Sequence, residues 1–250
     1  MAVHEIRIDP GKTLAEEPGT GRNRWHPGIA PAVRCAPGDE VVLETRDAFD
    51  GQMSPDASPQ TVAAPNLDVV HPLTGPVYVE GAEPGDVLKV EILAVEPDRY
   101  GYTVQVPGFG FLRDVFPEAF KVNWEIADGW ATSAGLPGVR IPGAPFMGTI
   151  GLAPGHELLA ATTAREQALL DRGGFVSPPT LASAVPADPR LAAEGLRVLL
   201  NMIDHLTERG WTRQQAYAIC GVAGDLKISQ LVDAPNMLVS AFLPEDIFTG

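Results

Sequence analysis

Two Pro-Gly-Asp turns, Pro37–Asp39 and Pro84–Asp86, each precede a run rich in aliphatic and β-branched residues. In such a turn proline presets φ, glycine supplies a positive φ and aspartate caps exposed backbone groups. The following runs, Glu40–Thr45 and Val87–Val95, are typical of strands. Because the residues just before the second turn alternate with period two, Val77–Val95 is predicted to be a hairpin. The repeat predicts two similar hairpins in one antiparallel sheet or barrel.

The rest of the first 154 residues is also rich in turns and strand-like segments. Val3–Asp9 and Tyr102–Val106 are predicted strands, and Val139–Ile150 ends in a further predicted strand, FMGTIG. Large apolar side chains are normally buried, so the aromatic residues between these segments are predicted to cover one end of the sheet as core. They are Phe109, Phe111, Phe116, Phe120, Trp124 and Trp130.

From residue 155 onward the pattern becomes helical. Asp188-Pro189 supplies an N-cap residue and a proline at the first helical position, and apolar residues at three-four spacing follow as far as Gly210. Thr212–Gln215 is a capping-box pattern that predicts a second, shorter helix. Asn236–Phe242, NMLVSAF, is predicted to be a final strand.

This order of elements predicts an α+β fold, since strands come first, helices follow and one strand comes last. A β-rich, sheet or barrel-like part is expected over residues 1–154. A helical part with a C-terminal strand is expected over residues 155–250, packed with the first as one unit. The 250 residues are enough for a sizeable core.

Charge and composition exclude several classes of function. The formal net charge of −14 argues against nucleic acid or an anionic membrane as a partner, because both need a positive surface. No apolar run approaches the length of roughly 18 residues that a membrane span requires. The two cysteines, Cys35 and Cys220, form no disulfide framework, and the start MAVHEIRIDPGK has no secretory-signal pattern. A cytoplasmic location is therefore expected.

Histidine and carboxylates gather near the two predicted hairpins. Such groups can bind zinc or another divalent ion, lower the pKa of bound water and polarise a carbonyl. Their spacing does not follow a metal signature such as HExxH, so ordinary roles stay open: a loop histidine before a proline, and carboxylates that cap turns. The candidates are Glu44, Asp47, Asp50, His71 and Glu80, with Asp225 and Asp233 late in the chain.

Several blocks resemble the acetamidase/formamidase family. They are RWHPGIAPA (Arg24–Ala32), TRDAFDGQ (Thr45–Gln52), VHPLTGPVYVEGAEPGDVLKVEI (Val70–Ile92), GTIG (Gly148–Gly151) and the C-terminal stretch Ala216–Phe248. The resemblance implies a β-rich fold with helices towards the C-terminus. It also implies metal-assisted hydrolysis of short aliphatic amides, such as formamide and acetamide, to ammonia and a carboxylate, and assembly into a homo-oligomer.

The chain departs from the family pattern in its central part. Two family motifs, GGNxD and GDxHxxQGDGE, occur nowhere in this sequence, and Ala192–Arg197 runs straight into VLLNMIDHLTERG. The missing block would supply a histidine, aspartates and a glutamate, which are residue types that a metal-assisted hydrolase uses.

For the positions that are present, the resemblance implies His71, Asp47 and Asp50 as ligands of a divalent ion, with zinc as the first candidate. It implies Glu80 and Asp47 as catalytic residues, with Glu80 as an acid/base group or a partner of a metal ligand, whereas Cys220 and Asp225 could equally be structural. Two alternatives stay open: a catalytically inactive family remnant that acts as a structural or assembly subunit, and a carbohydrate- or metabolite-binding barrel. The second alternative depends only on the aromatic segment.

Overall fold

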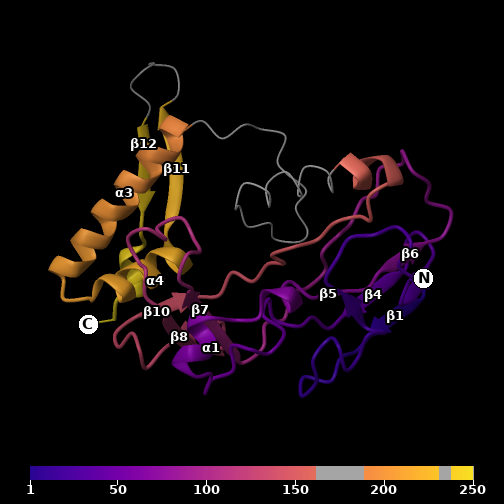
Figure 1. Cartoon of the computed structure of the whole chain (residues 1–250), viewed down its shortest axis with the longest axis horizontal. Coiled ribbons are helices and arrows are strands. Elements are labelled where there is room, and N and C mark those ends of the chain that lie inside the picture. Colours follow the sequence, from indigo (N-terminus) through magenta and orange to yellow (C-terminus); the bar gives the residue numbers. More distant parts are fainter. Residues whose placement is uncertain (162–188, 231–237, 250) are drawn as a thin grey trace. The chain divides into compact units, whose positions relative to one another are not determined.

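The computed structural model describes residues 1–161, 189–230 and 238–249. Its residues group into two compact units that interleave along the sequence (Figure 1). Unit 1 comprises Met1–Ser54, Pro65–Val95 and Phe146–Ala182, and unit 2 comprises Pro55–Ala64, Glu96–Pro145 and Ser183–Gly250. The division at residue 154 was predicted from the change in composition, and it stays a prediction. Each unit is described by itself.

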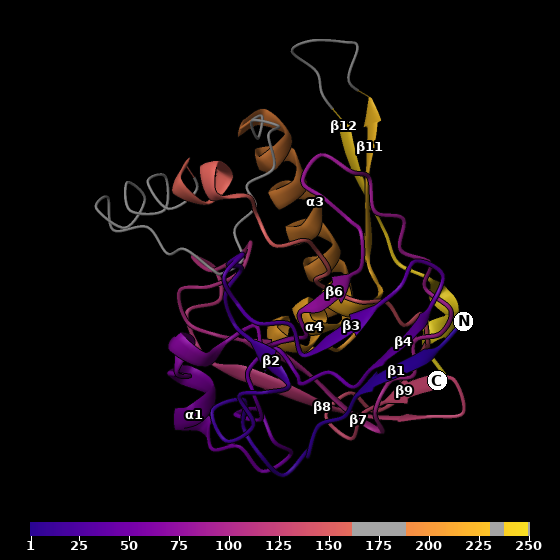
Figure 2. The same cartoon turned by 90° about the vertical axis from the view of Figure 1, so that its right-hand side faces the viewer.

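Unit 1 is built from pairs of short strands rather than one broad sheet. Figure 2 shows two of these pairs, β1 beside β4 and β3 beside β6, and both are parallel. The third pair, β2 with β5, is antiparallel. The strands are β1 (Val3–Ile6), β2 (Gly21–Arg22), β3 (Val33–Cys35), β4 (Glu40–Leu43), β5 (Leu73–Thr74) and β6 (Val77–Val79).

The first Pro-Gly-Asp turn is confirmed, and it leads into β4 as predicted. Gly38 has a φ of +89°, and the Asp39 N–H donates to the Ala36 carbonyl oxygen at 3.1 Å. The Asp39 carboxylate also accepts from the Ala2 N–H at 2.7 Å and lies 3.1 Å from the His4 ring. This carboxylate therefore holds the start of β1 beside the start of β4, which explains why the two strands pair in parallel.

The second Pro-Gly-Asp turn forms, but the hairpin predicted over Val77–Val95 is wrong. The Asp86 N–H donates to the Glu83 carbonyl oxygen at 3.0 Å, and Gly85 has a φ of +104°. Residues 87–95 nevertheless form no strand, because β6 takes β3 as its parallel neighbour. The two antiparallel hairpins in one sheet are thus not formed, and the described strands form no closed barrel. The predicted strand FMGTIG is not formed either.

Unit 2 contains a four-stranded antiparallel sheet in the order β10-β9-β8-β7. β7 overlaps the predicted strand Tyr102–Val106. The two residues between β8 and β9, Asp128 and Gly129, have φ values of +52° and +77°, as favoured tight hairpin turns require. The strands are β7 (Tyr100–Gln105), β8 (Phe120–Ala127), β9 (Trp130–Thr132) and β10 (Arg140–Pro142).

The predicted helices of unit 2 are confirmed. α3 (Pro189–Glu208) ends before Gly210, whose φ is +100°. The Gly210 and Trp211 N–H groups donate to the carbonyl oxygens of Thr207 and Leu206 at 3.0 and 3.2 Å, which is the Schellman pattern. α4 (Arg213–Ala223) opens with the predicted capping box, in which the Thr212 and Gln215 side chains accept from each other's backbone N–H.

The remaining elements of unit 2 are short. β11 (Asp225–Gln230) pairs antiparallel with β12 (Leu238–Phe242), which confirms the predicted final strand. α1 (Pro59–Ala63) is capped by the Ser58 side chain, and a 3-10 turn, η2, covers Glu245–Ile247. A similar turn in unit 1, η1, covers Leu67–Val69.

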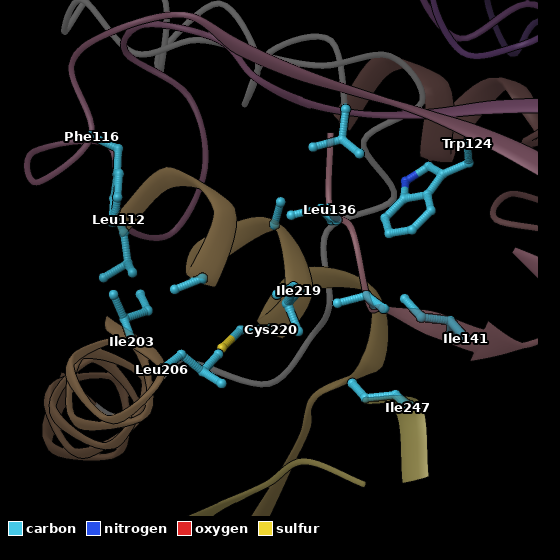
Figure 3. Close-up of a cluster of buried hydrophobic side chains, with 14 residues drawn as sticks. Leu112, Phe116, Trp124, Leu136, Ile141, Ile203, Leu206, Ile219, Cys220 and Ile247 are labelled. Carbon is cyan, nitrogen blue, oxygen red and sulfur yellow. The ribbon is translucent and has the colours of Figure 1, made fainter. Parts of the chain in front are cut away.

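One apolar cluster forms the core of unit 2 and joins its sheet to α3 and α4 (Figure 3). Phe116 and Trp124 lie in this cluster, each 5% exposed, so the core role predicted for these two aromatic residues is confirmed. Phe111 is 48% exposed and departs from that prediction. The rings of Phe116 and Trp124 are therefore not available to stack on a sugar.

Strands and helices together make an α+β fold, as predicted. Among the helices of the described part, none has the length and apolar character needed to cross a membrane.

Candidate functional site

A tight turn after β4 is built by the carboxylate of Asp47. Its two oxygens accept from the backbone N–H groups of Phe49 at 2.9 Å and Gly51 at 2.6 Å. The Asp47 carbonyl oxygen accepts from the Asp50 N–H at 3.0 Å. Asp50 and Gly51 both take positive φ values, +52° and +83°. The observed role of Asp47 is therefore to shape this turn.

The turn is tied to His71, which lies in the other block that resembles the family. The His71 N–H donates to the Ala48 carbonyl oxygen at 2.8 Å, and the His71 backbone has a φ of +56°. The residue before it, Val70, is 4% exposed and anchors the segment. The half-buried imidazole accepts or donates no hydrogen bond within the described part of the chain. Its ring nitrogens are therefore available to a ligand.

A second link between these blocks comes from Gln52. Its side-chain amide donates to the Asn66 carbonyl oxygen at 3.0 Å, and its side-chain oxygen accepts from the Asn66 N–H at 2.7 Å. The segment that delivers His71 is thus held at both of its ends. Sequence analysis did not single out Gln52, although it ends the TRDAFDGQ block, because a glutamine in a loop gives no local signal of its distant partner.

Asp50 is buried, with 6% of its surface exposed, and it anchors the N-terminal loop. Both carboxylate oxygens lie 3.0 Å from the Leu14 N–H, and Oδ1 is 3.9 Å from Nε of Arg46. The Arg46 guanidinium, itself buried, pairs through Nη2 with Glu17 at 2.6 Å. A cation beside Asp50 opposes the binding of a metal ion there, so Asp50 is better suited to a structural role.

Glu80 belongs to an exposed cluster at the end of β6. Its carboxylate pairs with Arg34 at 3.0 Å, and that guanidinium lies 4.1 Å from the centre of the Tyr78 ring. The hydrogen bond to Glu80 raises the pKa of Arg34. The Glu80 N–H donates to the Cys35 carbonyl oxygen at 2.8 Å and extends the pairing of β3 with β6. The side chain is half exposed and engaged in a surface ion pair.

The other candidate residues have structural surroundings. Glu44 accepts from the Ile8 N–H at 2.9 Å and pairs with Arg7 at 2.7 Å, and both contacts lower the pKa of its carboxyl. Cys220 lies in the core of unit 2, where burial raises the pKa of its thiol to about 11. Asp225 begins β11, and Asp233 lies outside the described residues.

These surroundings do not fit a self-contained metal site. Zinc takes three or four protein ligands. Within residues 1–161, 189–230 and 238–249, no three His, Cys, Asp or Glu side chains gather so that they could hold an ion. Of the three predicted ligands, Asp47 and Asp50 already accept from backbone N–H groups through their carboxylate oxygens, and His71 is the one whose side chain has no hydrogen-bond partner in the described residues.

An open hollow of about 570 Å³ lies in unit 2, lined by Tyr100, Asn123, Arg140 and parts of β8 and β9. It contains none of the residues predicted for the site. The candidate site is instead the Asp47 turn with His71, in unit 1.

The turn and His71 lie in stretches that identify the family. The model of the Acetamidase/Formamidase family matches residues 7–199 and 187–250, and the chain belongs to this family. The two matches meet at residues 187–199, the place where the sequence lacks the central motifs.

Two curated relatives match part of the chain. An acetamidase of Mycolicibacterium smegmatis is 38% identical over 176 residues, which cover 65% of this chain and 43% of that protein. A formamidase of Methylophilus methylotrophus is 37% identical over 211 residues, which cover 78% of this chain and 52% of that protein. The chain thus spans about half the length of the curated relatives it matches.

Solved structures with the same fold include proteins of nearly the same extent. A gamma lactamase from Delftia acidovorans superimposes with a TM-score of 0.82 at 22% identity, covering 99% of this chain and 94% of that chain. A predicted acetamidase/formamidase from the thermophile Thermoanaerobacter tengcongensis gives a TM-score of 0.52 at 27% identity, covering 62% and 46%. The first match shows that a known fold accounts for this chain almost from end to end.

Proposed function

We propose that this chain hydrolyses short linear amides, such as formamide and acetamide, to ammonia and a carboxylate. Membership of the family and relatives named acetamidase and formamidase support this class of reaction. The observation that carries the proposal is the half-buried His71 imidazole, which has no hydrogen-bond partner in the described chain and is held by its backbone against the Asp47 turn.

In this proposal His71 acts as the acid/base group. Water adds to the amide carbonyl carbon while an imidazole nitrogen takes its proton; the C–N bond then breaks as that proton passes to the leaving nitrogen. Histidine suits both transfers because it gains and loses a proton near neutral pH. Asp47 acts as a positioning residue, since its carboxylate shapes the turn whose Ala48 carbonyl oxygen holds His71.

Glu80 enters the proposal as a second candidate for proton transfer. Its carboxylate is accessible, but it is paired with Arg34. If it acts in catalysis, Glu80→Gln lowers turnover while the chain stays folded. If the ion pair is its whole role, the variant turns over as the unmodified chain does.

A divalent ion, zinc first, would polarise the amide carbonyl and lower the pKa of a bound water. His71 is the described donor that is free to bind it, whereas Asp47 and Asp50 would first have to release backbone N–H groups. Dependence on zinc is therefore tested as a separate arm of the experiment.

A second candidate function is that of a catalytically inactive structural or assembly subunit. Two observations favour it: Asp47, Asp50 and Glu80 all have structural partners, and the sequence contains neither the GGNxD nor the GDxHxxQGDGE motif.

Ammonia release from the purified chain distinguishes the two functions. Formamide and acetamide are offered with and without zinc, to the unmodified chain, to His71→Asn and to His156→Asn as the matched control at an exposed histidine. Asparagine tolerates the positive φ of residue 71, so the first variant removes the imidazole and keeps the backbone. We expect release that His71→Asn abolishes and His156→Asn retains. No release from either amide by a folded chain would contradict the amide hydrolase and favour the inactive subunit.

A further inference from the structure

The segment that follows the second Pro-Gly-Asp turn, residues 87–93 (VLKVEIL), is an exposed apolar run. Its exposed fractions are 96% for Val87, 38% for Leu88, 54% for Val90, 55% for Ile92 and 68% for Leu93. Within the part of the chain that the structure describes, no backbone N–H or carbonyl group of this segment is hydrogen-bonded to another residue. It therefore presents both apolar side chains and unused backbone groups.

Such a segment has the composition of a strand without a neighbour. Its β-branched and aliphatic residues favour an extended backbone, and alternation places Leu88, Val90 and Ile92 on one face. A segment of this kind can form a strand against another chain, because pairing satisfies the backbone groups and covers apolar surface.

We propose that residues 87–93 pair antiparallel with the same residues of a second copy of this chain, with Val90 opposite Val90 at the two-fold axis. The resulting interface is isologous, as in most homodimers. This proposal does not depend on the amide-hydrolase proposal, because the segment includes none of the candidate catalytic residues.

The charges within the segment select this arrangement. With Val90 opposite Val90, Lys89 of each copy faces Glu91 of the other, so two opposite-charge pairs form. Leu88 faces Ile92 on the apolar face, and Val87 faces Leu93 on the charged face. Every apolar side chain thus meets an apolar one, and every charged side chain meets one of opposite charge.

Other alignments lose this match. Parallel pairing in register places Lys89 against Lys89 and Glu91 against Glu91. An antiparallel shift of one residue sets charged against apolar side chains and exchanges the two faces. An antiparallel shift of two residues in either direction places one of the two charges against itself. The charge pattern therefore specifies both direction and register.

The existing contact between the two charges does not oppose the dimer. In the single chain Lys89 and Glu91 lie 3.6 Å apart with 86% and 71% of their side chains exposed. An ion pair so exposed contributes little to stability, so exchanging it for two cross-chain pairs costs little. Two short strands alone form a marginal ribbon in water, and we expect a reversible dimer.

Cysteine cross-linking tests the pairing directly. Directly opposed residues of antiparallel strands have Cα atoms about 4.5–5.5 Å apart, within disulfide range, so Val90→Cys is expected to form a dimer under mild oxidation. Leu88→Cys is the matched control, since two copies of residue 88 lie roughly 13 Å apart along the strands in this register. The native cysteines are both buried. Equal cross-linking of the two variants, or none at residue 90, would overturn the proposal.

Charge exchange tests the register in solution by sedimentation of the full chain. Lys89→Glu and Glu91→Lys each place like charges opposite one another, and each is expected to weaken the dimer about tenfold. The double variant K89E/E91K restores both pairs and should regain the original dissociation constant. A double variant no tighter than the single ones would contradict this register. If the chain stays monomeric, residues 87–93 do not pair with a second copy, and a different protein would have to be their partner.

Discussion

The backbone N–H of His71 donates to the carbonyl oxygen of Ala48 at 2.8 Å, and a non-glycine residue with a positive φ lies at or near each end of this bond. Asp50 and His71 account for two of the three such residues in the described chain; the third, Asp128, lies in a tight hairpin turn. A positive φ is uncommon for a residue other than glycine. It persists where surrounding contacts hold the backbone in place, often at functional sites. The bond joins the two halves of the candidate site.

The positive φ of His71 predicts an unusual order of stability among its variants. The Cβ of alanine makes a left-handed backbone conformation unfavourable, whereas glycine adopts it freely. His71→Ala should therefore be less stable than His71→Gly by about 1 kcal/mol. Urea denaturation followed by circular dichroism measures the difference.

The matched control for this order is His205, an exposed residue inside α3. There the ranking should reverse, because glycine is less favourable than alanine by about 1 kcal/mol in a helix. The same ranking at both positions would show that residue 71 does not hold a left-handed backbone.

Removing the charge of Asp50 should destabilise the chain strongly, whereas removing that of Glu80 should not. Asp50→Asn leaves the buried Arg46 with Glu17 as its remaining carboxylate partner, and a loss of about 2 kcal/mol is expected. Glu80→Gln breaks a half-exposed pair and should cost less than about 1 kcal/mol. Chemical denaturation of both variants gives the comparison, and equal costs would contradict the structural role assigned to Asp50.

Acid should weaken the contact between β1 and the turn before β4. The Ala2 N–H, the His4 ring and the Ala36 N–H hold the pKa of Asp39 down to about 2, from an ordinary value of 3.8. Because the folded pKa is the lower one, this carboxylate stabilises the fold above pH 3.8, and its contribution is lost as the pH falls to about 2. Unfolding followed across this range should depend less on pH in Asp39→Asn; an unchanged slope would contradict these contacts.

Neither cysteine should react while the chain is folded. Burial raises the pKa of the Cys220 thiol to about 11, and burial, followed by the charges of Asp39 and Glu80, raises that of Cys35. The thiolate is the reactive form, so a thiol reagent at neutral pH should label both residues only after denaturation. Labelling of Cys220 in the native chain at the rate of a free thiol would contradict its place in the core.

The helices could be predicted from the sequence because their signals are local. Each signal acts within one turn of a helix end. The structure contains both the capping box of Thr212 and Gln215 and the turn at Gly210. The start of the longer helix at Asp188 lies outside the described residues, so that cap stays a prediction.

The strand pairings could not be predicted, because they depend on neighbours far apart in the sequence. The pattern of Val77–Val95 is equally compatible with a hairpin and with β6 pairing to β3, and it contains nothing about Val33–Cys35. Asp128-Gly129, in contrast, was a local hairpin signal that could have revealed β8 and β9.

For the candidate site, the sequence indicated the right neighbourhood but not the roles. Asp47 and His71 do come together, through the Ala48 carbonyl oxygen. The carboxylates hydrogen-bond to the backbone or lie beside Arg46, and these contacts involve residues such as Leu14 and Glu17. No rule of sequence spacing connects such distant residues, so the contacts could not be predicted.

Chemical rescue of His71→Gly tests the central claim most directly. Glycine keeps the left-handed backbone and removes the imidazole, so the variant should fold and lose ammonia release from formamide, and added imidazole should restore part of it. His156→Gly, given the same imidazole, should release ammonia as the unmodified chain does. Release by His71→Gly at the unmodified rate would contradict the role of His71, and no release by the unmodified chain would contradict the proposed reaction itself.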